Sequence, residues 1–292
     1  MASVHQDVKQ FSSKVAYPTI VMTIVAVAVY VMISIAVIQG AIHYGWAILI
    51  NSIMAYLLFT SMHEAGHLNI SGKHTSLRWI DEIIGWVSGI PLLAPFYTFR
   101  TIHFRHHAFT NDPEKDPDHW LASKNFFALL FHSTTIFPVY LIKGLQLLLF
   151  EPKIPRKVKK DLRIGYVGLA VIVMMIVGLS MIIGWGMVLK IWILPAIVAQ
   201  IFLAITFDWL PHHPHEERDR YQNTRIIDIP GLNLFMLGQN YHLIHHLYPK
   251  IPFYNYKEFY HEHQDTFKEK GTEIIEVGKN QNATTTEQPK TF

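Results

Sequence analysis

The sequence of 292 residues contains no cysteine. This absence excludes a disulfide framework, a thiolate metal site and a cysteine nucleophile. Charged residues are also scarce, at 16% of the chain, compared with about 25% in an ordinary soluble domain. The net charge of +3 does not indicate a nucleic-acid-binding protein, which usually carries basic clusters on one folded face. Half of the residues are hydrophobic, so the composition favours a membrane protein.

Four apolar stretches are long enough to cross a bilayer, which takes roughly 20 residues of helix. They run from Val15 to Ile38, from Tyr44 to Met62, from Ile164 to Ile183 and from Val188 to Leu210. Two further segments, Leu77–Arg100 and Asn125–Phe150, are apolar but interrupted by charged residues and proline. We expect these two to be interfacial or re-entrant helices. The pattern predicts an all-α integral membrane protein with four transmembrane helices.

The distribution of positive charge predicts the orientation of these spans. Lysine and arginine are absent between Val15 and Gly72, and they are concentrated between Lys153 and Arg163, just before the third span. Because positively charged loops stay in the cytoplasm, we expect both termini and the long middle segment to be cytoplasmic. Residues 1–270 are predicted to form one membrane domain, and residues 271–292 a disordered polar tail.

Histidine is unusually abundant, with 18 residues, and eleven of them fall in four tight groups. Residues three or four positions apart lie on one face of a helix, so each group can present its imidazoles together. The spacing H-x-x-H-H, which occurs twice, offers three imidazoles from one short helix. The groups are His63 and His67; His103, His106 and His107; His212, His213 and His215; and His242, His245 and His246.

The number of these histidines predicts two metal ions. The two H-x-x-H-H boxes and the pair His63 and His67 supply eight ligands, more than one ion can take, and His212 would be a ninth. Imidazole-only sites suit iron, zinc, copper or nickel. Oxidation of an unactivated C–H bond requires a metal or cofactor, and two irons at the membrane surface would explain so many histidines. The second and fourth spans end directly before His63 and His212, so all the groups can meet on the cytoplasmic side.

At these boxes the sequence resembles the membrane fatty acid desaturase superfamily, from about His63 to Tyr256. Residues 103–119, 207–218 and 238–256 are most similar to the cyanobacterial-type β-carotene hydroxylases of that superfamily. The resemblance implies four transmembrane helices under a cytosolic helical cap that holds two irons, with O₂ as co-substrate. The iron ligands that it implies are His63, His67, His103, His106, His107, His212, His242, His245 and His246.

The resemblance also draws attention to neighbouring polar residues. Asp208 stands where acyl-CoA desaturases have an asparagine that contacts iron through water, so Asp208 is a further candidate ligand. Other polar residues are expected to orient the ligands, because a metal-bound histidine usually donates its second N–H to a carboxylate or carbonyl. These residues are Glu64, Asp118, His119, His213, His215, Gln239 and Asn240. For His119 and its acidic neighbours, a purely structural turn fits equally well. We expect no catalytic residue beyond the metal ligands.

The predicted function is O₂-dependent oxidation of C–H bonds in a lipid-soluble substrate, specifically hydroxylation of a carotenoid β-ring. The alternative is an enzyme acting on a fatty acyl chain, by desaturation, hydroxylation or formation of a terminal alkene or alkyne. A more distant alternative is an intramembrane zinc protease, because His63-Glu64-x-x-His67 matches the metalloprotease helix. The H-x-x-H-H boxes are superfluous to such a one-zinc enzyme. A metal transporter would need polar groups within the spans, which offer almost none.

Electrons must come from a separate donor of ferredoxin or cytochrome b₅ type, because the sequence has no haem signature of a fused cytochrome b₅ domain. The other expected partners are membrane lipid and the hydrophobic substrate. The basic run Lys153–Arg163 has three interpretations. It sets the topology, which we favour, or it contacts anionic lipids, or it docks an acidic electron donor.

Overall fold

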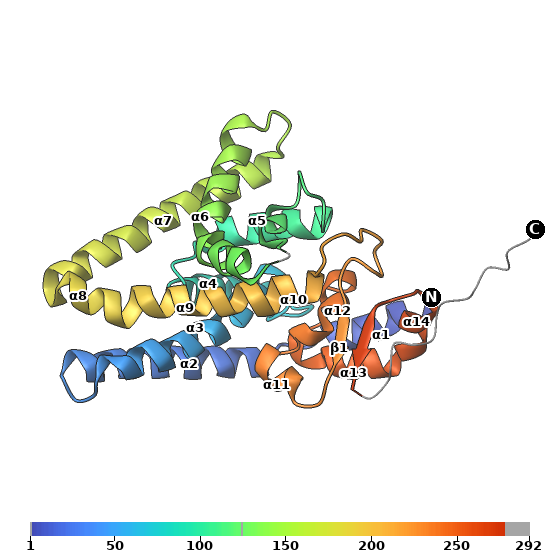
Figure 1. The fold of residues 1–292 in the computed structure, drawn as a ribbon, viewed down its shortest axis with the longest axis horizontal. Coiled ribbons are helices and arrows are strands. Elements are labelled where there is room, and N and C mark those ends of the chain that lie inside the picture. The colour runs from blue at the N-terminus through green and yellow to red at the C-terminus, as the bar shows by residue number, and fades with distance from the viewer. Residues whose placement is uncertain (1, 124, 278–292) are drawn as a thin grey trace, which may run out of the picture.

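The computed structural model describes residues 2–123 and 125–277, and most of these residues are helical (Figure 1). The long apolar helices are α2 (Tyr17–Ile38), α3 (Tyr44–Gly66), α6 (Phe126–Phe150), α7 (Arg156–Ile183) and the run Trp185–His212. That run comprises α8 (Trp185–Val188), η3 (Leu189–Ile193), α9 (Leu194–Leu203), η4 (Ala204–Trp209) and α10 (Leu210–His212). The shorter helices are α1 (Ala2–Ser12), η1 (Thr75–Leu77), α4 (Arg78–Gly89), α5 (Phe96–Phe109), η2 (Pro117–Leu121), α11 (Leu232–Met236), η5 (Gln239–Tyr241), α12 (His242–Leu247), η6 (Phe253–Asn255), α13 (Tyr256–Glu262) and α14 (Gln264–Glu269).

Five helices in the described chain are long and apolar enough to cross a membrane, whereas the sequence predicted four. Four of the five include the expected spans. The fifth is α6, which we expected to be interrupted by Pro138 and Lys143. The structure instead shows one continuous helix of 25 residues with Pro138 inside it. An apolar helix can accommodate a proline where neighbouring groups satisfy the freed backbone, so these two residues were too weak a signal to end α6.

The segment Leu77–Arg100 also differs from the single helix that was expected. It contains α4 and the beginning of α5, with a turn between them. The tail differs as well. Within the stretch from Gly271 that was expected to be disordered, β2 (Ile274–Glu276) pairs in parallel with β1 (Ile226–Asp228). Residues 278–292 lie outside the described residues.

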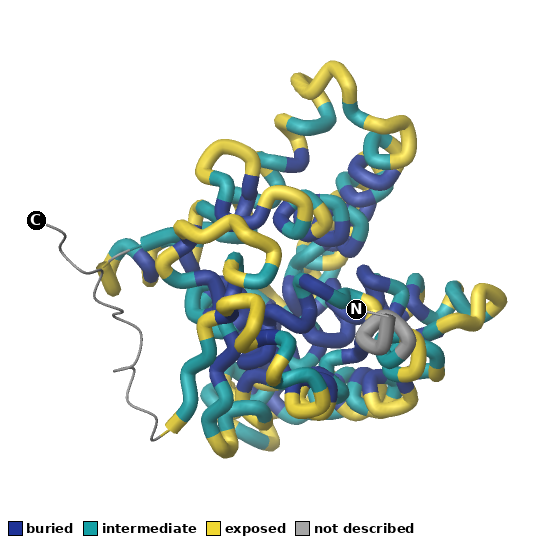
Figure 2. The backbone as a smooth tube through the Cα atoms, turned by 90° about the vertical axis from the view of Figure 1, so that its right-hand side faces the viewer, coloured by how far each residue is buried: buried dark blue, intermediate teal, exposed yellow. Residues whose placement is uncertain are grey.

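Helix α3 is at the centre of the packing, in contact with α2, α4, α5 and α9. Its last turns are buried from Thr60 to Gly66, and buried residues concentrate in the interior of the molecule (Figure 2). Phe96, Phe99 and Phe207 pack in the same core as the end of α3. Burial of each such side chain contributes about 1.5–3 kcal/mol. This core therefore holds the first histidine pair rigidly beneath the cap.

Two polar clamps fix the chain on either side of the first two boxes. The buried side chain of Arg100 in α5 bridges Glu82 in α4 at 3.3 Å and Asp161 in α7 at 3.2 Å. Asp81 accepts hydrogen bonds from the Ile70 amide at 3.0 Å and from the Ser71 side chain. Since a buried charge is tolerated only when it is paired and hydrogen-bonded, these contacts specify how α4, α5 and the turn after α3 fit together.

Candidate metal centre

All nine histidines predicted as ligands converge at one place in the fold. They come from the end of α3, from α5, from α10 and from α12. We call His63, His67, His103, His107 and His245 cluster 1. We call His106, His212, His242 and His246 cluster 2. Adjacent residues of each H-x-x-H-H box thus contribute to different clusters, because their side chains point to different sides of one helix.

In cluster 1 the Nε2 atoms of five imidazoles approach one another closely. The Nε2–Nε2 distance is 3.0 Å between His63 and His245 and 2.9 Å between His67 and His103. The Nε2 atom of His107 lies 3.0 Å from that of His103 and 2.7 Å from that of His245. Two nitrogens that each lie about 2.1 Å from one ion are about 3.0–3.4 Å apart in octahedral or tetrahedral coordination. The spacing in cluster 1 is therefore close to that of a single coordination sphere.

Cluster 2 shows a second sign that a cation belongs there. The Nδ1 atom of His106 lies 2.9 Å from the Asp116 carboxylate, and that of His242 lies 2.6 Å from the Gln239 side-chain oxygen. Both oxygens accept, so each Nδ1 carries a proton, and the lone pair of each ring in its neutral form lies on Nε2. Both lone pairs point at His246, at 3.3 and 3.1 Å. A shared metal ion would satisfy them.

His212 supports the same conclusion. It is buried, and its ligand nitrogen lies within 4.8 Å of those of the other three histidines in cluster 2. Neither of its ring nitrogens has a hydrogen-bond partner among the described residues. Because a buried polar atom without a partner costs about 1–3 kcal/mol, a bond from His212 to a metal ion would remove this cost.

The protonation states also suit metal binding. Burial and neighbouring histidines hold the pKa values of His67, His103, His107, His242, His245 and His246 well below the usual value of histidine. These rings are neutral at pH 7, as a metal ligand must be. His106 differs. Its burial disfavours the charge, but the Asp116 and Asp118 carboxylates outweigh this effect and raise the pKa of His106 to about 10. A metal ion would compete with a proton for its Nε2.

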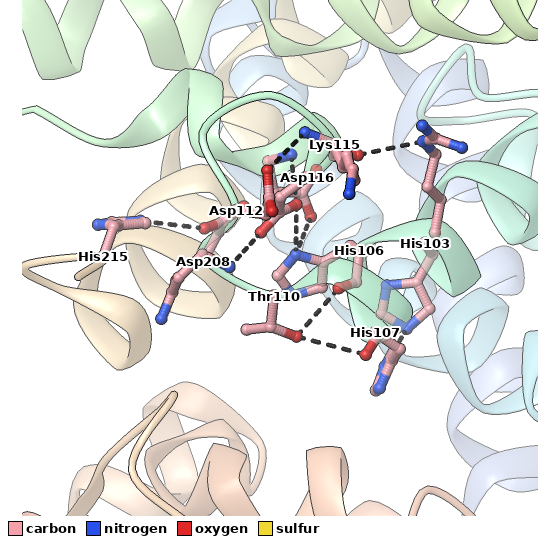
Figure 3. Close-up of polar contacts among 12 residues, drawn as sticks. His103, His106, His107, Thr110, Asp112, Lys115, Asp116, Asp208 and His215 are labelled. Carbon is pink, nitrogen blue, oxygen red and sulfur yellow. Dashed lines mark hydrogen bonds and ion pairs between the residues drawn. The ribbon is translucent and has the colours of Figure 1, made fainter. Parts of the chain in front are cut away.

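Contacts of the Nδ1 atoms orient several of the ligand rings. Besides Asp116 at 2.9 Å, the Asp118 carboxylate lies 3.4 Å from Nδ1 of His106. Figure 3 shows the ring of His106 directed toward Asp116, with Thr110 on the same helix end. Nδ1 of His246 is 3.3 Å from the Thr110 hydroxyl, and Nδ1 of His245 is 3.1 Å from the Tyr256 hydroxyl. Such contacts hold a ring in the orientation and tautomer that binding requires.

The remaining predicted residues lie farther from the clusters. Asp208 is absent from the groups of potential ligand atoms found among the described residues. Its carboxylate lies 3.6 Å from Nε2 of His215 (Figure 3). The ring of His119 is 6.3 Å from that of His215, and His213 packs on Trp209 at 4.8 Å. The structure therefore brings these four residues beside cluster 2 and not into it.

Glu64 and Asn240 have contacts that hold the backbone. The buried Glu64 carboxylate accepts from the Asn69 side chain and from the Phe253 amide, both at 3.4 Å. Asn240 donates to the Ile227 carbonyl at 3.0 Å. Asn240 thus fixes β1 against the last box. Sequence reasoning missed Tyr256 and Thr110, because neither belongs to a box and only the fold brings their hydroxyls to the rings.

An apolar cavity ends at the two clusters. His63 and His103 of cluster 1 and His106 and His242 of cluster 2 line its polar end. Most of its remaining wall is apolar and comes from α3, α5, α6, α9 and η4, including Phe59, Phe99, Phe137, Leu203 and Phe207. Asp118 and Asp208 lie at the same polar end. The arrangement can hold a hydrophobic chain with one segment beside both candidate metal positions.

Comparison with known proteins identifies similar sequences. A family model described as fatty acid desaturase matches residues 17–278. The chloroplastic omega-3 fatty acid desaturase of Sesamum indicum is 25% identical over 234 residues, which cover 70% of this chain and 51% of that protein. The sn-1 oleoyl-lipid 12-desaturase of Picosynechococcus sp. is 24% identical over 229 residues, 69% of this chain and 63% of that protein. The sn-1 acyl-lipid omega-3 desaturase (ferredoxin) of Nostoc sp. is 26% identical over 241 residues, 71% of this chain and 63% of that protein. The chain thus spans between half and two thirds of the length of these relatives.

Proposed function

We propose that this chain, which belongs to the fatty acid desaturase family, is a membrane oxidoreductase that oxidises C–H bonds of a fatty acyl chain with two iron ions and O₂. One observation carries the proposal: two adjacent histidine clusters lie at the end of an apolar cavity. Two clusters suit two ions, and the cavity suits a substrate with no polar group near the reacting carbon. The apolar wall also excludes water from the reaction.

When bound, the irons would supply the oxidising power of O₂, which side chains lack. The nine histidines would hold the ions, while Asp116, Gln239 and Tyr256 keep the N–H of three rings away from them. Desaturation takes two hydrogen atoms from neighbouring carbons. With one O₂, two electrons and two protons it yields a double bond and two waters. The protein residues therefore bind and orient, and the electrons come from outside the chain.

The cavity and the relatives favour an acyl chain over the carotenoid that we expected from the sequence. The names of the three relatives refer to fatty acids or acyl lipids. Cavity residues on α9 and η4 run from Gln200 to Asp208, a distance of roughly 12 Å along a helix axis. A mostly apolar lining suits an acyl chain, and the histidines in that lining would lie beside the segment that reacts.

The structure also bears on the protease alternative. His63 and His67 both point into cluster 1, but five histidines already meet there. A catalytic zinc keeps three protein ligands and an open position. Glu64, which would be the general base, has its carboxylate directed toward Asn69 and Phe253. These contacts support the two-metal oxidoreductase.

We further propose that the cap faces the cytoplasm. Helices α1, α12, α13 and α14 lie together at one end of the molecule (Figure 1), and α1 packs on α13 through Phe11 and Phe259. The basic run Lys153–Arg163 would then lie on the cytoplasmic side, as positively charged loops do. A separate electron donor would reach the clusters from this side.

The test combines metal analysis with product analysis on the full chain in detergent or nanodiscs. We expect about two irons per chain and an oxidised acyl chain after supply of electrons and O₂. His106→Ala and His245→Ala, one in each cluster, should abolish oxidation and lower iron content while the protein stays in the membrane. The exposed His261, outside both clusters, provides the matched control His261→Ala.

Three results would decide against the proposal. Full activity in His106→Ala or His245→Ala would exclude the two-metal assignment. One zinc and no iron per chain would favour the protease. Two irons with hydroxylated β-carotene and unchanged acyl chains would restore the carotenoid interpretation.

A further inference from the structure

Two of the nine box histidines differ from the others in their exposure. Seven are buried, whereas His107 and His246 are half-buried. His107 belongs to cluster 1 and His246 to cluster 2, and their rings stack with centroids 4.4 Å apart and an interplanar angle of 23°. The two clusters therefore reach the protein surface at the same place, through one ring each.

At this place the surface is hollowed and polar. His107 and His246 line the hollow together with Thr110, Asp112, Arg218, Arg220 and Asn223. We call it the histidine hollow. The apolar cavity described above approaches the clusters through other histidines, namely His63, His103, His106 and His242. The hollow is therefore a separate access to the metal positions, on the solvent side.

The walls of the histidine hollow carry a positive excess, with two arginines and one aspartate. Arg218 is exposed and lies 3.3 Å from Asp112. Arg220 donates to the Leu247 carbonyl at 3.1 Å, which holds its guanidinium beside the last box. On the other side the hollow is bordered by the exposed ring of Phe109.

Two more cations lie at this border. The guanidinium of Arg105 is 5.1 Å from the ring centroid of Phe109, and the ammonium of Lys115 is 5.6 Å from it. Cations at such distances from an aromatic ring are attracted to its face. The hollow thus has two arginines in its walls and an aromatic ring at its border, and two further cations lie over that ring. A partner that matches this surface carries acidic groups around an apolar contact.

We propose that the histidine hollow is the docking site of a small acidic electron-transfer protein, whose electrons enter the two clusters through His107 and His246. The inference rests on the proposed function, which consumes two electrons per O₂. A one-electron donor would be oxidised twice per turnover and would deliver one electron to the metal pair each time. Electron transfer slows steeply with distance, so the exposed edge of a metal ligand is the favoured point of entry. Because each cluster contributes one ring to the hollow, a donor bound there could pass electrons to both clusters from one position.

The basic run Lys153–Arg163, which the sequence offered as a docking site, is the competing surface. It follows α6 and forms the start of α7. In Figure 1 this loop stands apart from α10 and α12, at the edge of the molecule. No histidine of either cluster comes from α6 or α7. A donor bound there would be charge-matched, but the run supplies no candidate ligand and none of the residues that line the histidine hollow.

Two double variants of equal charge separate these surfaces. Arg218→Glu with Arg220→Glu reverses two cations that line the histidine hollow. Lys153→Glu with Lys160→Glu reverses two cations of the basic run, and all four residues are exposed. The measurement is the second-order rate constant for anaerobic reduction of the iron-loaded protein by reduced [2Fe–2S] ferredoxin. Reduction by dithionite in the same protein shows that the metal centre is intact.

At low ionic strength we expect the hollow variant to be reduced at least about tenfold more slowly by ferredoxin, since charge steering changes association rates by about 10 to 1,000-fold. Its dithionite reduction should equal that of the parent, and its salt dependence should be weaker. The control variant should stay within about twofold of the parent. Slower reduction of the control variant alone, or of neither variant, would overturn the proposal.

A second readout does not depend on bound metal. Because the chain has no cysteine, Ala108→Cys places a single photo-crosslinker on the exposed wall of the hollow. Lys153→Cys places the same probe on the basic run. We expect purified ferredoxin to cross-link from position 108 and not from position 153, and the reverse pattern would refute the docking site. Failure of the proposed function is distinguishable, because ferredoxin would then cross-link and reduce the protein without any acyl product.

Discussion

Tyr256→Phe removes a single hydroxyl from the candidate metal centre. The Tyr256 ring is fully buried in an apolar cluster at the start of α13, and its hydroxyl lies 3.1 Å from Nδ1 of His245. Burial raises the pKa of Tyr256 well above its usual value, so the group is a neutral phenol that can accept the His245 N–H. Phenylalanine fills the same space, so the packing should remain.

The lost contact leaves a buried imidazole N–H without its partner. Removal of a partner of this kind lowers metal affinity by about 10 to 100-fold, which corresponds to about 1.4–2.8 kcal/mol. That range agrees with the cost of about 1–3 kcal/mol for one unsatisfied buried donor. We therefore expect cluster 1 to lose its iron at about 10 to 100-fold lower chelator concentration, while cluster 2 changes little.

The assay is iron retention of the purified protein against a graded series of a ferrous chelator. Tyr260→Phe is the matched control, because Tyr260 is also fully buried on α13 but its hydroxyl contacts Gln264 at 3.1 Å. It should lose iron at the parent concentration. Identical retention in Tyr256→Phe and Tyr260→Phe would refute the reasoning that Tyr256 supports a metal ligand.

Three further predictions test the turn before the last box, the cavity and the titration of the ligands. Gly238→Ala should destabilise the fold by roughly 1–3 kcal/mol in denaturant unfolding, because Gly238 has φ +81° and an added Cβ would overlap the Phe253 carbonyl. Gly178→Ala, which meets nothing within 4 Å, should be neutral or stabilising, and equal effects would contradict the argument. Ala204→Phe should fill the cavity and lower acyl turnover at least tenfold at unchanged iron content, whereas Ile197→Phe on the exposed side of α9 should not. If both variants keep full turnover, the substrate lies elsewhere. Without metal, the histidines of α12 have pKa values well below their usual one. Below about pH 6.5 the unfolded chain therefore binds more protons than the folded chain, and the free energy of unfolding decreases as the pH is lowered. A melting temperature that is the same at pH 7.5 and 5.5 would contradict this sign.

Much of the architecture was readable because the bilayer imposes a strong local pattern. A span needs about 20 consecutive apolar residues, so α2, α3, α7 and α9 could be located from short windows of sequence. The limit of that signal was α6, where single polar residues and Pro138 look like breaks although the helix continues. The strand β2 was missed because its pairing with β1 joins segments about 48 residues apart, which no local window contains.

In the candidate metal centre, too, some features follow from local sequence and others depend on contacts between distant segments. Helical spacing alone brings His103, His106 and His107 together, and the number of boxes implies two metals. The spacing does not decide which ring joins which cluster, because that depends on the angle at which α5 meets α12 and the end of α3. The contacts of His245 with Tyr256 and of His246 with Thr110 likewise exist only in the packed cap.

The sequence by itself indicated that the protein lies in a membrane, and it predicted the class of the metal ligands and the approximate number of ions, because hydropathy and helical periodicity are local properties of a chain. Tertiary structure alone decided the partition into two clusters, the carboxylate and hydroxyl groups behind the rings, the cavity and the hollow at His107 and His246. Each of these is a distance between segments remote in sequence. Such distances are set by how apolar surfaces pack, which no single segment encodes.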